Sequence, residues 1–92
     1  MRVIGYLESS TCKITVFKQG FRFSVKFEDG LYEQTFKFRE SNELAGINDI
    51  QKLIDEEFKQ EVMKRFGEMR KATSALLDRY LEGDEEDWVN IV

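Results

Sequence analysis

The stretch Phe21-Arg22-Phe23-Ser24-Val25-Lys26-Phe27 is the most regularly patterned part of this 92-residue chain. Its aromatic and aliphatic residues alternate with polar and cationic ones. Successive side chains of a β-strand point to opposite faces, so this alternation predicts a strand with one apolar face and one cationic face. The rest of the chain has to cover the apolar face.

Three further segments with similar alternation surround this stretch. The pattern predicts strands over residues 2–8, 12–18, 21–28 and 31–38. They are separated by a hydroxyl-rich turn at residues 9–11 and by Gln19-Gly20 and Asp29-Gly30. An Asp-Gly pair between alternating segments is a strong hairpin signal, because a type I′ turn needs positive φ at both central positions.

Two-residue turns at these sites define a register for the sheet. The predicted opposite pairs are Leu7 with Cys12, Val16 with Phe23, Phe23 with Phe36, and Phe21 with Phe38. In this register one face collects the apolar residues of all four strands, whereas a slip by one residue would turn a strand's apolar set outward. The sequence therefore predicts a four-stranded antiparallel β-meander of order 1-2-3-4 with one buried face.

The second half of the chain has the period of an amphipathic helix. Asn48 is a good N-cap residue, and an apolar stripe follows at helical spacing. The members of the stripe are Ile50, Leu53, Ile54, Phe58, Val62, Phe66, Met69, Thr73, Leu76, Tyr80 and Leu81. A glycine inside a helix costs only about 1 kcal/mol, so one helix over residues 49–82 that is bent near Gly67 is favoured over two helices broken there. Gly83 is a natural residue to end it.

The predicted fold is therefore a single α+β domain over residues 1–82, with an acidic and aromatic tail over residues 83–92. A helix over residues 49–82 would be roughly 50 Å long, while a seven-residue strand spans about 24 Å. The excess helix must find another surface. Its near-heptad spacing favours a homodimer formed through the helix.

Composition and charge limit the class of protein. The chain is 41% hydrophobic and 35% charged, with a net charge of −4, which is typical of a globular domain. Residues 1–39 contain seven basic and four acidic residues, whereas residues 40–92 contain seven basic and fourteen acidic residues. The apolar runs are too short for a transmembrane segment, and no signal-peptide core follows Met1. With a single cysteine, Cys12, we expect a cytoplasmic protein.

Catalytic, metal and cofactor sites are poorly supported by the sequence, so neither an enzyme nor a bound cofactor is expected. The chain has no histidine and no glycine-rich phosphate loop. Cys12 is interpreted as a buried small hydrophobe, and Asp55, Glu56 and Glu57 as a solvated face, since consecutive helical residues diverge. The acidic residues 82–87 match no EF-hand spacing and are interpreted as a solubilising segment.

The face of the sheet opposite the helix is the most informative surface in the sequence. It is predicted to carry Ile4, Tyr6, Lys13, Thr15, Phe17, Arg22, Ser24, Lys26, Leu31, Glu33, Thr35 and Lys37. Aromatic residues beside cations on a sheet can hold single-stranded nucleic acid, but no RNP-like motif is present. Gln34, a polar residue on the buried side, is explained if strand 31–38 is an edge, where its amide reaches solvent or the following loop.

The favoured function is a non-enzymatic protein-interaction module, such as an adaptor, inhibitor or accessory subunit. The alternative is a single-stranded nucleic-acid-binding protein that uses the open face of the sheet. The segment 88–92 has high β propensity and is predicted to act as an added strand or docking segment. The candidate partner-binding residues are Tyr6, Phe17, Arg22, Lys26, Leu31, Trp88 and Ile91.

Overall fold

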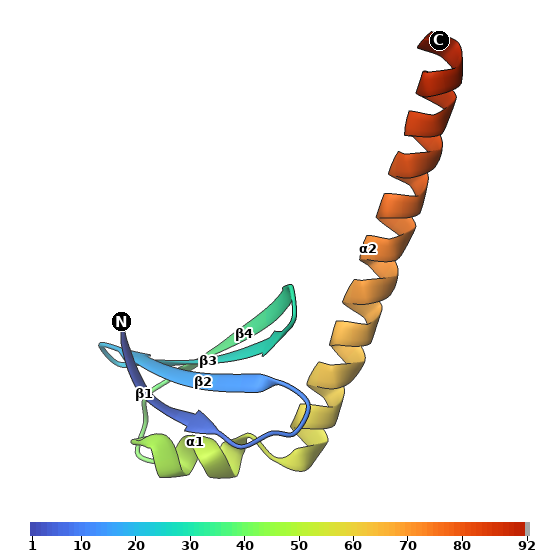
Figure 1. Ribbon diagram of the computed structural model, residues 1–92. Helices are drawn as coiled ribbons and strands as arrows, with labels where there is room; N and C mark the ends of the chain where they lie inside the picture. The colour runs from blue at the N-terminus through green and yellow to red at the C-terminus, as the bar shows by residue number, and fades with distance from the viewer. Residues whose placement is uncertain (92) are drawn as a thin grey trace.

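The computed structural model describes residues 1–91, with the side chains of residues 1–82. Its elements are β1 (Arg2–Leu7), β2 (Lys13–Gln19), β3 (Arg22–Asp29), β4 (Tyr32–Arg39), α1 (Ile47–Leu53) and α2 (Glu56–Ile91). The strands form one antiparallel sheet of order β1-β2-β3-β4. Helix α1 packs beneath the sheet, and α2 rises past the end of the β3–β4 hairpin (Figure 1). The predicted α+β fold with a four-stranded antiparallel meander and a long C-terminal helix is confirmed.

The predicted register is wrong by two residues. Val25 lies opposite Val16 on one side and Phe36 on the other, whereas the prediction placed Phe23 there. The turns are Gly20-Phe21 and Gly30-Leu31, in which each glycine has positive φ (59° and 62°) and the residue after it does not. A glycine at the first central position is typical of a type II′ turn, so each turn lies one residue later than predicted.

A shift of two residues keeps every side chain on its predicted face, except at the turns and in β1. Phe21 was predicted on the buried face, but it lies at a turn and is 80% exposed. In β1 the pairing with β2 is irregular between Val3 and Gly5. This bulge places Val3 opposite Phe17 and lets Ile4, predicted on the open face, pack against the core.

The core lies between the sheet and the two helices. Its fully buried side chains are Ile14, Val16, Phe23, Val25, Phe27, Ile50, Val62 and Phe66. Phe27 packs edge-on against Phe36 and Phe58, with ring centroids 5.8 and 5.9 Å away. Burial of this apolar surface is the main stabilising term of the fold.

The helical segment is divided at Ile54-Asp55, so the prediction of one helix over residues 49–82 is wrong, and the predicted bend or break near Gly67 is not confirmed. Asp55 Oδ1 accepts a hydrogen bond from Phe58 N at 2.8 Å and so caps the start of α2. Asn48 instead lies inside α1, which begins after Gly46. Helix α2 is continuous through Gly67, where an added Cβ would meet no heavy atom within 4 Å.

Two polar contacts attach α2 to the sheet. Gln34 Nε2 donates to Val62 O at 2.9 Å, so the amide of this edge-strand residue is bound to the helix. The prediction that it reaches solvent or the following loop is therefore wrong. Arg70 pairs with Asp29 and lies over the ring of Tyr32. The last contacts between helix and sheet therefore lie near Arg70, and the remainder of α2 extends away from the domain.

Helix α2 continues through Gly83 to Ile91, so the backbone of Trp88–Ile91 is helical and not a strand, whereas the predicted docking role of residues 88–92 stays a prediction and Val92 lies outside the described residues. The predicted boundary at Gly83 therefore does not end the helix. The described chain measures 64 × 26 × 17 Å, and the long dimension runs along α2 (Figure 1). Of the residues that the structure describes, no helix has the length and apolarity needed to span a membrane.

Candidate interaction surfaces

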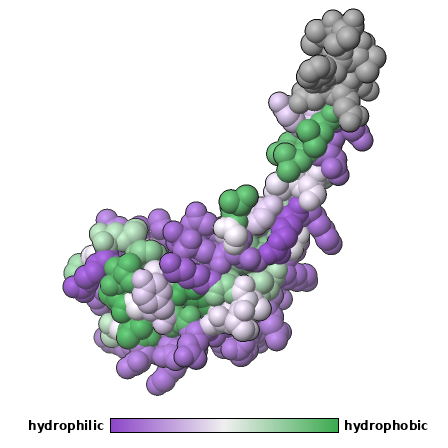
Figure 2. All heavy atoms as spheres, in the orientation of Figure 1, coloured by the Kyte–Doolittle hydropathy of each residue, from purple (hydrophilic) through white to green (hydrophobic). Residues whose placement is uncertain are grey.

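The projecting part of α2 carries an uncovered apolar surface. Its members, which we call the projecting stripe, are Leu76, Leu77, Tyr80 and Leu81, with 55%, 51%, 63% and 56% of their surface exposed. At 100° per residue they share an arc of roughly 140° with Val62 and Phe66, which are buried against the sheet. The apolar face that builds the core thus continues past the sheet, where Figure 2 shows it as hydrophobic atoms on the extended helix.

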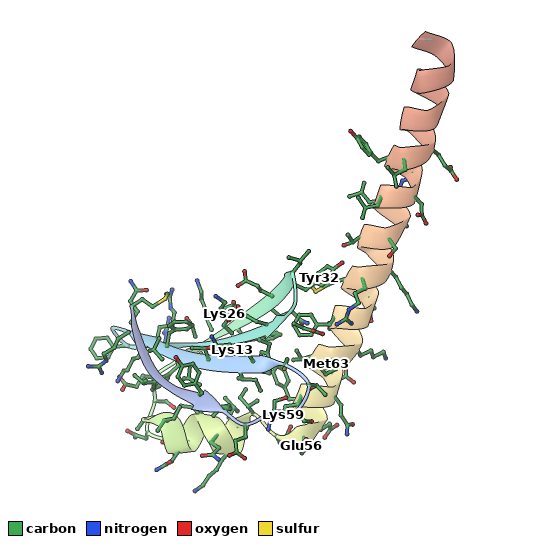
Figure 3. The ribbon with its side chains drawn as sticks, viewed as in Figure 1. Lys13, Lys26, Tyr32, Glu56, Lys59 and Met63 are labelled. Atoms are coloured by element: carbon green, nitrogen blue, oxygen red, sulfur yellow. The ribbon has the colours of Figure 1, made fainter. Side chains whose placement is uncertain are left out.

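The open face of the sheet, opposite the helices, has a mixed character. The small residues Thr15 and Ser24 at its centre are only 4% and 5% exposed, because larger side chains surround them. Tyr6 lies at one side with Lys13 Nζ 5.8 Å from its ring centroid. Figure 3 shows Lys13 and Lys26 on the central strands of this sheet.

The positive charge of Lys26 is balanced by carboxylates that lie close to it on the open face. Its Nζ lies 3.1 Å from Glu33 and 3.8 Å from Glu28. The hydrogen bond to Glu33, followed by the attraction of Glu28, raises the pKa of Lys26 above its usual value. Since its charge is matched by neighbours, Lys26 is a weaker candidate for binding an external anion than the sequence indicated.

A second group of cations on the same face is not matched in this way. We call Arg22, Lys37 and Arg39 the basic cluster; Arg22 lies directly opposite Arg39, and Lys37 opposite Ser24. All three are exposed, and no carboxylate of residues 1–82 lies within 4.0 Å of them. Like charges directly opposite each other are destabilising, so an external anion would stabilise this end of the sheet.

The structure brings together some of the predicted partner-binding residues and separates others. Tyr6, Phe17 and Lys26 share the open face, and Arg22 lies at the end of that face. Leu31 is 99% exposed but lies at the β3–β4 turn, apart from this group. Trp88 and Ile91 lie outside residues 1–82, the part of the chain whose side chains the structure describes.

Several of the groups considered for acid–base or thiol chemistry have structural partners. Asp55 caps α2, and Glu56 forms an ion pair with Lys59 at 3.3 Å, at the base of α2 in Figure 3. Cys12 is half-buried with its Sγ 3.6 Å from Ser9 Oγ. Within residues 1–82 no cluster of three or more acidic or cysteine side chains could hold a metal ion.

Sequence reasoning missed two parts of these surfaces. The excess helix length predicted a homodimer through the helix that includes Leu76 and Tyr80, but Leu77 was not singled out and the projecting stripe was not among the candidate partner-binding residues. Lys37 was placed on the open face, but Arg39 was left outside the strand. The two-residue change in register is what sets Arg39 opposite Arg22.

Comparison of the chain with protein-family models, with curated proteins and with solved structures finds no match. The function of this chain therefore has to be inferred from its own residues.

Proposed function

We propose that this protein is a non-enzymatic protein-interaction module of the adaptor, inhibitor or accessory-subunit kind, and that it binds through the projecting stripe. The observation that carries the proposal is the exposure of Leu76, Leu77, Tyr80 and Leu81 on one side of a helix that has already left its own domain. A contiguous apolar patch of this kind on a polar surface marks a protein-interaction site.

The spacing of these side chains suits a known mode of recognition. An amphipathic helix presents anchors at i, i+3 and i+4 to a groove or to another helix, and Leu77, Tyr80 and Leu81 have this spacing. Tyr80 is a residue type enriched among interface hot spots. The polar side of the helix, which includes Ala75 and Glu82, would stay in water.

We place this module in the cytoplasm. The support is its single cysteine, Cys12, which has no second cysteine in this sequence with which to form a disulfide. A binding role is supported over a catalytic one because two of the candidate reactive groups, Asp55 and Glu56, are used in capping and ion pairing.

Substitution of the stripe should abolish partner binding without unfolding the domain. We expect the variant with Leu77→Asp and Leu81→Asp to lose the proteins captured by the wild-type chain from its native host, because each new charge would be buried in the interface. The matched control carries Lys71→Gln and Ala75→Asp, which lower the net charge equally at exposed positions on the other side of α2. Captured proteins would be quantified by mass spectrometry.

The outcome of that capture experiment separates the alternatives. Proteins retained by the wild-type chain and the control but lost from the stripe variant support the proposal. Equal retention by all three chains would contradict it. A normal melting temperature and helical circular dichroism for each variant would show that the domain is folded.

The open face supports a second candidate, a single-stranded nucleic-acid-binding protein. The specific observation is the basic cluster beside an exposed aromatic residue: Phe21 lines a shallow hollow together with Arg22 and Arg39. Aromatic rings that stack on bases, combined with cations that contact phosphates, are typical of such proteins.

A labelled single-stranded oligonucleotide tests the second candidate. If the three cations of the basic cluster contact phosphates, affinity should fall about 20-fold between 50 and 200 mM salt, and Arg22→Glu with Arg39→Glu should abolish binding. The control variant Lys64→Glu with Lys71→Glu changes the net charge equally on α2. Binding that is absent, or that is weakened equally by both variants, would reject the candidate.

A further inference from the structure

Three surfaces of this chain fit one another but are not in contact within one molecule. They are the projecting stripe, the open face with its basic cluster, and the segment 82–87, which we call the acidic end. The acidic end contains five acidic residues and no basic one: Glu82, Asp84, Glu85, Glu86 and Asp87. The basic cluster contributes three cations that the described carboxylates leave unmatched.

The acidic end cannot reach the basic cluster of its own sheet. Helix α2 is continuous from Glu56 to Ile91 and packs against the sheet as far as Arg70. At 1.5 Å per residue, Glu82 lies about 18 Å further along the helix than Arg70. Figure 1 shows the helix leading away from the sheet over this distance. Contact between the two charged surfaces therefore requires two molecules.

We infer that the occupant of the projecting stripe is a second copy of this chain, in a two-fold dimer in which each stripe and acidic end lie across the open face and basic cluster of the other copy. This inference deepens the proposed function, on which it rests, by naming the partner.

The open face offers apolar contacts as well as charge. Val3 and Tyr6 are exposed there, and Phe17 is half-buried between Val3 and Ser24. A helix whose leucines pack on these residues would place its acidic last turns toward the positive side of the same sheet. The sheet would then be covered on both faces, by its own helices on one and by the partner's helix on the other.

The area required by a stable dimer favours this arrangement over pairing of the stripes alone. Four half-exposed side chains provide roughly 400 Å² per copy at about 100 Å² each, whereas a stable interface needs about 800 Å² per partner. A two-fold axis makes the helix-on-sheet contact twice, which supplies the additional area.

Charge also disfavours the simplest alternative, a parallel pairing of the two α2 helices. That arrangement would bring the two acidic ends, each with five acidic residues and no basic one, close together. Like charges on neighbouring helices are destabilising. On the partner's sheet, Asp84 and Asp87, which fall at the same helical spacing as the projecting stripe, would instead lie near Arg22, Lys37 and Arg39.

A charge-swap experiment on the full-length chain tests the dimer. The sheet variant carries Arg22→Glu and Arg39→Glu, and the helix variant carries Asp84→Lys and Asp87→Lys. Each variant alone opposes like charges in both copies of the interface, so we expect its dimer dissociation constant to rise at least tenfold in sedimentation equilibrium. An equal mixture matches opposite charges at both contacts and should restore the dissociation constant to within threefold of the wild-type value.

The control and the remaining outcomes each decide the matter. Lys64→Glu with Lys71→Glu lowers the net charge as much as the sheet variant does and should leave the dissociation constant unchanged. A wild-type chain that stays monomeric at tens of micromolar overturns the dimer, while the capture experiment with the stripe variant still decides the proposed function. If the sheet variant remains dimeric, the helix-on-sheet dimer is rejected in favour of direct pairing of the helices. The same conclusion follows if the mixture forms no heterodimer. Oligonucleotide binding that depends on Arg22 and Arg39 would assign the basic cluster to nucleic acid and overturn the helix-on-sheet dimer as well.

Discussion

Replacement of Phe27 by alanine should lower the free energy of unfolding by about 3–5 kcal/mol. Phe27 is fully buried in the central strand β3, where its ring packs edge-on against Phe36 of β4 and Phe58 of α2. Removal of the ring loses its transfer free energy and leaves a cavity bounded by the sheet and the helix. Two aromatic contacts between different elements are lost with it.

The matched control is Phe21→Ala, six residues earlier in the same patterned stretch. Phe21 is 80% exposed at the β2–β3 turn, so its truncation should change the free energy of unfolding by no more than about 0.5 kcal/mol. Urea denaturation followed by circular dichroism would measure both variants. Comparable losses for the two variants would contradict the register described above, because Phe21 is inward-facing only if both turns lie one residue earlier.

This pair of phenylalanines also shows how far the sequence alone could predict the fold. Alternation fixes which side chains share a face, and it correctly placed Phe23, Val25 and Phe27 inside. Alternation cannot distinguish registers that differ by two residues, because both bury the same face. The difference lies in the turns, where positive φ falls on Gly20 and Gly30 as the first central residue.

The helical half shows a second limit. The apolar stripe predicted helix over almost the whole segment, but the division at Ile54-Asp55 depends on a competition between a capping side chain and a continued helix. Asp55 caps α2 through its carboxylate, whereas Gly67, near which a bend was predicted, is accommodated inside the helix at the small cost that the prediction assumed.

The candidate surfaces could be predicted only in part, since both depend on tertiary arrangement. Tyr80 and Val62 have the same place in the helical pattern, and only the point at which α2 leaves the sheet makes one exposed and the other buried. The basic cluster likewise exists because the register sets Arg39 opposite Arg22. The sequence pattern predicted which residues are charged or apolar on each face, but it could not predict which residues lie next to them in the folded protein.

Truncation of the chain after Ala75 should remove self-association completely and leave the domain folded. The truncated chain keeps all ten fully or nearly fully buried hydrophobic residues, the last of which is Phe66. It also keeps the contacts of Gln34 with Val62 and of Arg70 with Asp29. The new terminal carboxylate lies at the C-terminal end of a helix, where the dipole makes it unfavourable by about 0.3–1 kcal/mol.

We therefore expect the free energy of unfolding of the truncated chain to lie within about 1 kcal/mol of that of a full-length monomer. The variant with Leu77→Asp and Leu81→Asp serves as that monomeric reference. A dimer gains stability with protein concentration by mass action, so the urea midpoint of the wild-type chain should rise with concentration while those of the truncated chain and the reference stay constant. Light scattering on the same samples would report their masses. A truncated chain that is unfolded would show that residues 76–92 belong to the folded domain. A truncated chain that remains dimeric would show that the interface lies elsewhere. With the expected result, the first 75 residues form the domain, and the rest of α2 serves only in binding.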